Sequence, residues 1–179
     1  MQEKNRNILI GSILMISGAG LSVVLTLVYG SVFGRSLEAY VGTLTADEAF
    51  AAELAASGMT LDAVVEAMQG TLTVLLVLAV LFQLVKIAVG VWGLRRAARP
   101  ATAFVAWGAV FLALGLLGMM FSGVTSVFGL CDLAGGVLGP GLFLWGGVQN
   151  KLAFRRMLAA ERAAEEQQAD ESAWPPVRR

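Results

Sequence analysis

Four long apolar stretches alternate with shorter polar or charged segments along the chain. The stretches cover residues 8–33, 71–94, 101–121 and 124–148. An α-helix rises about 1.5 Å per residue, so stretches of roughly 20 residues or more are long enough to cross a hydrocarbon layer of about 30 Å. The pattern predicts an all-α protein in which four transmembrane helices pack as a bundle.

The first stretch is either a cleavable signal peptide or a retained span. It is longer than the apolar core of a signal peptide, which has about 7 to 15 residues, and its end, YGSVF, is a poor match to a small-x-small cleavage site. We therefore expect a retained helix. Gly11, Gly18 and Ser22 recur along it at helical spacing, which either favours close helix packing in lipid or reflects the frequency of glycine in membrane helices.

Residues 34–70, between the first two stretches, are acidic and predict two short helices. Thr45 and Glu48 have the spacing of a capping box, which predicts a helix over 46–56, and Thr60 can cap a second helix over 61–69. We expect a helical hairpin that directs its apolar side chains toward the bundle or the lipid headgroups. Those side chains are Phe50, Leu54, Leu61, Val64, Val65 and Met68. The alternative is a cap that binds a ligand or a partner.

The last apolar stretch contains a candidate helix break. Gly139 and Pro140 lie in a glycine-rich run, and proline removes an intrahelical hydrogen bond, so we expect a kink or local unwinding near Gly139. Such breaks line binding sites in some transporters, whereas in small bundles they are more often tolerated bends.

Residues 151–179 contain charges of both signs and predict a different kind of segment. We expect an amphipathic helix to about residue 168 and a disordered tail over 170–179. The predicted organisation is thus a membrane domain over 1–150 and a cytoplasmic helix and tail over 151–179.

Basic residues flank alternate ends of the four stretches, and this asymmetry predicts the orientation. They are Lys4, Arg6, Arg95, Arg96, Arg99, Lys151, Arg155 and Arg156. Because basic residues of short loops stay in the cytoplasm, we expect a multi-pass plasma-membrane protein with both termini and the 95–100 turn inside. Trp92, Trp107 and Trp145 would then lie at the inner headgroup level.

The composition excludes several classes of function. The chain is 57% hydrophobic, has a formal net charge of zero and lacks a long basic stripe, so nucleic acid is not an expected partner. It has no histidine and only Cys131, which removes histidine-based metal ligation and catalysis and any intrachain disulfide. We therefore predict a protein that is not an enzyme and has no catalytic residues, metal site or cofactor.

Lys86 and Asp132 are the two ionisable side chains inside the apolar stretches that stand out. Lys86 lies about eight residues before the end of its stretch, and Asp132 lies about eight residues after the start of its own. In antiparallel directions from the two membrane surfaces, this leaves about 6 Å between their depths. The stripe of Gln83, Lys86, Gly90 and Gly93 and the stripe of Thr125, Gly129, Asp132, Gly136 and Gly139 both have helical spacing. We predict that the second and fourth spans are neighbours. A structural ion pair, two unpaired groups, and a proton-handling or ion-handling site remain open.

The sequences GVWGLRR, from Gly90, and LWGGVQNK, from Leu144, close the second and fourth spans with a Trp-Gly step and basic residues. In this the chain resembles small bacterial four-span membrane proteins of uncharacterised function, and the resemblance implies the same fold. It differs from the small multidrug exporters, because residues 8–33 hold no acidic side chain, and from claudins, because it lacks paired cysteines.

Two functions follow as expectations. The first is a non-enzymatic structural, accessory or partner-binding membrane protein, whose partners are the bilayer and either another protein or a second copy of the chain. The second is a small ion-coupled or proton-coupled transporter that uses Lys86 and Asp132.

Overall fold

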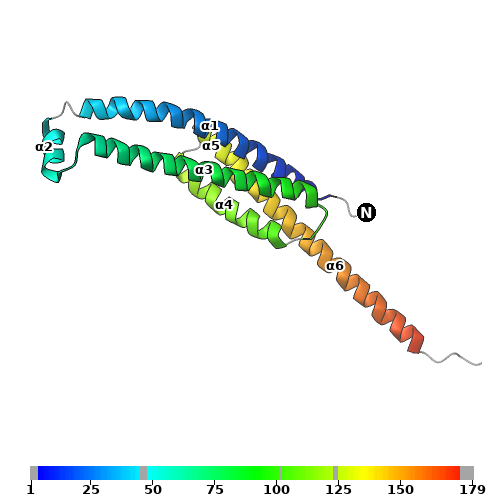
Figure 1. Cartoon of the computed structure of the whole chain (residues 1–179). Helices are drawn as coiled ribbons and strands as arrows, with labels where there is room; N and C mark the ends of the chain where they lie inside the picture. The colour runs from blue at the N-terminus through cyan, green and yellow to red at the C-terminus, as the bar shows by residue number, and fades with distance from the viewer. Residues whose placement is uncertain (1–3, 45–47, 101, 123–124, 174–179) are drawn as a thin grey trace, which may run out of the picture.

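Helices account for all the regular structure in the part of the chain that the computed structural model describes, residues 4–44, 48–100, 102–122 and 125–173 (Figure 1). In chain order they are α1 (Arg6–Leu44), α2 (Glu48–Ser57), α3 (Leu61–Arg96), α4 (Thr102–Ser122), α5 (Val127–Cys131), the π-helix η1 (Asp132–Leu138) and α6 (Gly139–Ala173). Four helical segments are long and apolar enough to cross a membrane: Arg6–Thr43, Leu61–Arg96, Thr102–Met120 and Gly129–Asp170. The prediction of an all-α protein with four such helices is confirmed.

Two helices are longer than the sequence predicted. α1 continues to Leu44, so the first part of the expected outer segment extends the first helix instead. Leu37 and Val41, one helical turn apart on this extension, are both buried, and tertiary packing of this kind outweighs the weak helix propensity of nearby glycines. α6 continues to Ala173, beyond the expected end at residue 168. Thr45 and residues 174–179 lie outside the described residues.

Residues next to the helix ends explain where three of the helices begin or end. The side-chain oxygen of Asn5 accepts hydrogen bonds from the backbone N–H groups of Asn7 and Ile8, at 2.9 and 3.3 Å, and so caps α1. Thr60 caps α3 as expected, through a 3.3 Å bond from the N–H of Ala63. α2 ends at Gly58, whose positive φ of 71° suits a residue without a Cβ.

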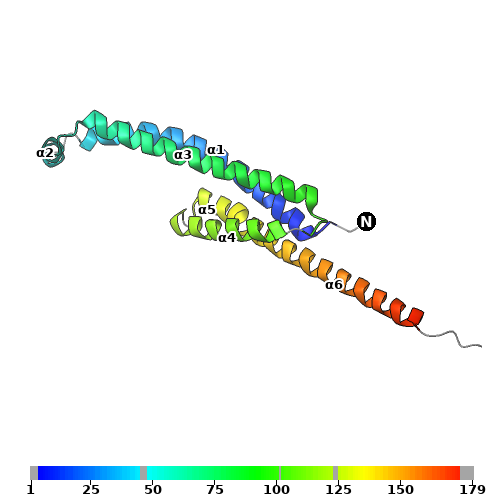
Figure 2. The same cartoon turned by 60° about the horizontal axis from the view of Figure 1, so that its bottom comes forward.

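The helices are arranged around α1. α1 packs along α3 on one side and against η1 and α6 on another, and α4 packs on η1 and α6. Figures 1 and 2 show α1 and α3 running side by side, with α4, α5 and α6 against one end of this pair. α3 and α4 make little contact, so the bundle is held together mainly through α1 and the η1–α6 helix.

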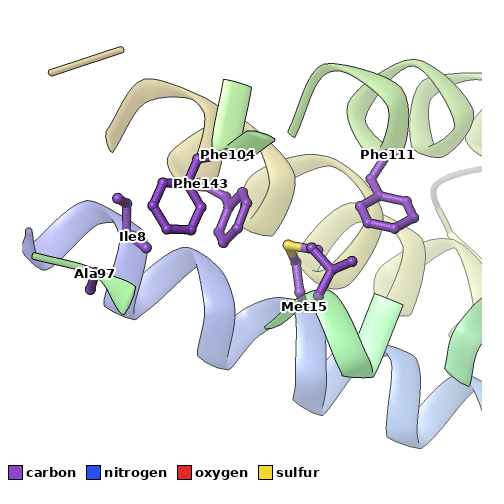
Figure 3. Packing of buried hydrophobic residues seen from close by; sticks show 7 residues of the cluster. Ile8, Met15, Ala97, Phe104, Phe111 and Phe143 are labelled. Atoms are coloured by element: carbon purple, nitrogen blue, oxygen red, sulfur yellow. The ribbon is translucent and has the colours of Figure 1, made fainter. Parts of the chain in front are cut away.

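Aromatic side chains fill the centre of the bundle (Figure 3). The rings of Phe104 and Phe143 meet edge to face, with centroids 5.2 Å apart, and Phe104 also lies 4.7 Å from the ring of Trp92. Phe111 extends the cluster toward Phe82, at 5.7 Å. Because these rings come from α3, α4 and α6, they join three helices in one core.

The start of α3 and helix α2 present a partly covered apolar surface. Phe50, Leu54 and Val64 are half-buried around a shallow hollow of about 330 Å³. Met68, expected with them to face either the bundle or the lipid headgroups, is 44% exposed. The bundle therefore does not cover Met68, and a position among the headgroups stays a prediction.

Candidate functional site

The fourth span is irregular in the seven residues before Gly139, where η1 replaces the α-helix. Pro140 supplies the physical cause: its ring clashes with the carbonyl of the residue four positions earlier, Gly136, and it has no N–H to donate. The displaced carbonyl of Gly136 lies directly against the backbone of Gly115 on α4. The wider π-turn thus accommodates both the proline and a close contact between helices, and such turns are frequent at functional sites.

Lys86 and Asp132 both point into the bundle from α3 and from the first residue of η1. Lys86 is only 3% exposed, and its Nζ lies 5.5 Å from the centroid of the Phe82 ring. Asp132 is half-buried at the first residue of η1. A Cβ built on Gly118 would lie 3.5 Å from Oδ2 of Asp132, so this carboxylate faces α4 as well.

The small residues beside Lys86 contact α1 more than they contact the fourth span. A Cβ on Gly90 would meet Ile16 and the carbonyl of Ser12, and one on Gly93 would meet the hydroxyl of Ser12 and the ring of Phe143. α1 is the principal neighbour of α3, and α6 packs on α1 and α4 to about the same extent. The second and fourth spans were predicted to be neighbours. Their direct packing is limited to side chains such as Phe143 that reach across the bundle.

The second small-residue stripe divides between two helices. Gly136 faces Gly115 of α4, whereas Gly139 faces Met15 and the backbone of Gly11 on α1. Gly135, which the predicted stripe omitted, packs on Gly18 of α1. The prediction assumed α-helical spacing, and the π-turn between Asp132 and Leu138 changes which residues share a face.

Two further polar atoms in the spans are buried without a hydrogen-bond partner among the described residues. They are the hydroxyl of Ser12 and the side-chain carbonyl of Gln83. Leaving such an atom unsatisfied costs about 1 to 3 kcal/mol, so each is a candidate for binding water or a transported ion. Gln83 belonged to the predicted stripe. Ser12 was not predicted as a site residue, although its position next to Gly11 in the sequence could have indicated it.

A network of amide side chains joins three helices at one end of the bundle. This end carries the basic residues and is here called the basic end; they are Lys4, Arg6, Arg95, Arg96, Arg99, Lys151, Arg155 and Arg156. Nδ2 of Asn5 donates to Oδ1 of Asn150 at 2.8 Å and to the carbonyl of Gly146 at 3.3 Å. Nδ2 of Asn150 donates to the carbonyl of Ala97 at 2.9 Å, and Nδ2 of Asn7 donates to Oε1 of Gln149 at 2.8 Å. This network was not predicted, although the four amide residues at the ends of apolar stretches are a signal that the sequence contains.

We expect the Asn5→Ala variant to lose about 1 to 3 kcal/mol of the free energy of unfolding, because both the α1 cap and the link to α6 disappear. Asn5→Ser is the matched variant: its hydroxyl oxygen can still cap α1, but it lacks the amide that donates to Asn150 and Gly146, so its loss should be smaller. Unfolding in mixed detergent micelles, followed by circular dichroism, measures both. A loss for Asn5→Ser as large as that for Asn5→Ala would contradict the capping role.

Comparison with protein-family models, curated proteins and solved structures gives no match. Among the described residues, no three His, Cys, Asp or Glu side chains gather closely enough to hold a metal ion.

Proposed function

We propose that this chain is a non-enzymatic integral membrane protein of structural or accessory role that binds a protein partner outside the bilayer. The observation that supports a binding role is the α1–α3 extension, defined here as residues 34–44 of α1 and 61–70 of α3, which continue the two helices beyond the apolar stretches 8–33 and 71–94. Figure 1 shows the α1–α3 pair projecting past α4 and α5 to α2 at its tip. Ten residues of α3 correspond to about 15 Å of helix.

The extension combines charged residues with an apolar groove. Arg35, Asp62 and Glu66 are exposed on it, which suits a segment in water. A groove of about 470 Å³ follows α3 on the same extension, with Met59, Ala67 and Met68 in its wall, and it continues along α3 as far as Leu75. An apolar groove on a segment that carries exposed charges is typical of a protein-binding surface.

A photo-crosslinking residue placed in cells at Ala67, in the groove, tests this role. Glu66 is the matched control, because it is adjacent in sequence, exposed, and outside the groove. We expect a discrete protein adduct, or a covalent dimer of the chain, from Ala67 and none from Glu66. Adducts of equal yield at both positions, or none at either, would contradict a specific binding groove.

We further propose a plasma-membrane location with both termini cytoplasmic and the α1–α3 extension outside. The support for this orientation is the clustering of basic residues at the end of the bundle opposite the extension. The expected outer hairpin of α2 and the start of α3, and the cytoplasmic position of the end of α6, belong to the same proposal.

Single cysteines at Ser57 and at Ala98 test the orientation in a Cys131→Ala background. We expect a membrane-impermeant thiol reagent to label Ser57→Cys in intact cells, because this position lies at the end of α2. Ala98→Cys, in the α3–α4 turn, should react only after the cells are opened. Labelling of Ala98→Cys in intact cells would reverse the proposed orientation.

A small ion-coupled or proton-coupled transporter is the second candidate. It is favoured by the buried Lys86, by Asp132 at the start of a π-helix and by the unsatisfied oxygens of Ser12 and Gln83. Reconstituted wild-type protein should then dissipate a pH or ion gradient across liposomes, and Lys86→Met should not. Equal leakage through both would remove this candidate.

A further inference from the structure

A polar cavity opens at the basic end, where the start of α1, the α3–α4 turn and α6 meet. Its volume is about 380 Å³, within the range of ligand pockets in proteins. Lys4, Arg6, Asn7 and Gln149 contribute to its wall, and Ala98 closes one side. The amide network of Asn5 and Asn150 holds these elements together, so the cavity is built from three helices rather than from one flexible terminus.

The charged side chains around this cavity are all basic. Arg95, Arg96, Arg99 and Lys151 follow on the neighbouring helix ends. Of the described residues at this end, none is acidic before Glu161 on α6; Glu3 lies outside the described residues. The cavity therefore favours an anion, and the positive end of the α1 helix dipole adds to this preference.

Side chains, rather than the backbone, are the groups available to a ligand. The side chain of Asn5 already bonds the N–H groups of Asn7 and Ile8, so the first turn of α1 is capped. Oε1 of Gln149 accepts from Asn5 and Asn7. Within the described residues, the charged groups of Lys4 and Arg6 and Nε2 of Gln149 have no hydrogen-bond acceptor, and these are donors suited to phosphate oxygens.

The depth of the cavity identifies the source of the anion. It lies level with the ends of the apolar stretches, beside Ile8 at the start of the first and Val148 at the end of the fourth. In a bilayer this level is the headgroup layer, where the phosphate of a lipid is held in place by its acyl chains. Basic pockets between membrane helices at this depth bind the headgroups of anionic lipids.

We propose that the cavity binds the phosphate headgroup of an anionic phospholipid through Lys4, Arg6 and Gln149. This site rests on the proposed membrane location and is independent of the partner-binding groove at the opposite end. A bound lipid bridges α1, the α3–α4 turn and α6 at the basic end, and so stabilises the packing of the bundle.

The test measures lipid binding to the full-length protein in neutral detergent, by native mass spectrometry and by thermal unfolding. The probes are phosphatidylglycerol, phosphatidylcholine with the same acyl chains, and inorganic phosphate. The test variant is the double change Lys4→Gln and Arg6→Gln. Its matched control, Arg155→Gln with Arg156→Gln, removes the same charge from exposed positions of α6 outside the cavity.

We expect wild type and the control variant to bind phosphatidylglycerol with affinities within about twofold of each other, and the test variant to bind it roughly 10- to 30-fold more weakly. Equal losses in the two variants would overturn the site, because general charge attraction would explain both. Binding of phosphatidylcholine at the same affinity would overturn the preference for anionic lipid. Inorganic phosphate that binds as tightly as phosphatidylglycerol would overturn the lipid as the source of the anion.

Two controls separate a failure of this site from other failures. Melting temperatures without added lipid show whether both double variants are folded. Retention of the wild-type protein in carbonate-washed membranes tests the membrane location by itself. A retained, folded protein that does not bind phosphatidylglycerol would contradict the lipid site alone, and a protein released by carbonate would contradict the membrane location.

Discussion

Gly115→Ala is expected to destabilise the bundle more than any other single methyl addition to it. A Cβ at this position would overlap the carbonyl group of Gly136, so either α4 or η1 must move. The backbone of η1 has little freedom to move away, because Gly135, the residue before Gly136, packs on Gly18 of α1. Overpacking of this kind costs about 1 to 3 kcal/mol, and more when the obstacle is backbone.

Thermal unfolding in detergent provides the measurement, and Gly141→Ala provides the matched control. Gly141 also lies in a helix apolar enough to span a membrane, but nothing lies within 4 Å of a Cβ built there. Its replacement should be neutral or stabilise the protein by up to about 1 kcal/mol through helix propensity. Equal effects of Gly115→Ala and Gly141→Ala would show that α4 and η1 do not approach each other this closely.

Lys86→Met and Asp132→Leu should each lower the free energy of unfolding by about 3 kcal/mol or more, because each leaves the other group buried without its opposite charge. The double variant should lose less than the sum of the two single losses. The physical reason is that removing both charges also removes the cost of burying either one. Thermal unfolding of all four proteins in the same detergent yields the coupling energy, expected at about 1 to 3 kcal/mol.

Asp62→Asn is the control for this cycle, since Asp62 is exposed at the start of α3. Combined with Lys86→Met, it should show additive losses. Additive losses for Lys86→Met and Asp132→Leu as well would mean that the two residues are not coupled, and the pairing hypothesis should then be dropped.

The sequence contained enough information for the helices and most of their ends. Runs of apolar residues predict membrane helices because no water is present in the bilayer to satisfy backbone groups outside a helix. Thr60 was correctly identified as a helix start signal because capping depends on residues within one turn. The pairing of Lys86 and Asp132 stays a prediction, although both side chains point into the bundle.

Only the tertiary structure decided which helices are neighbours and which residues meet. The central position of α1, the contact of Gly115 with Gly136, and the amide network of Asn5 and Asn150 all join residues far apart in the sequence. Helical periodicity determines which residues share a face but not which helix that face meets, and the π-turn after Cys131 changes even the shared face. The extra length of α1 has the same origin, because Leu37 and Val41 are buried by tertiary packing rather than held by local propensity.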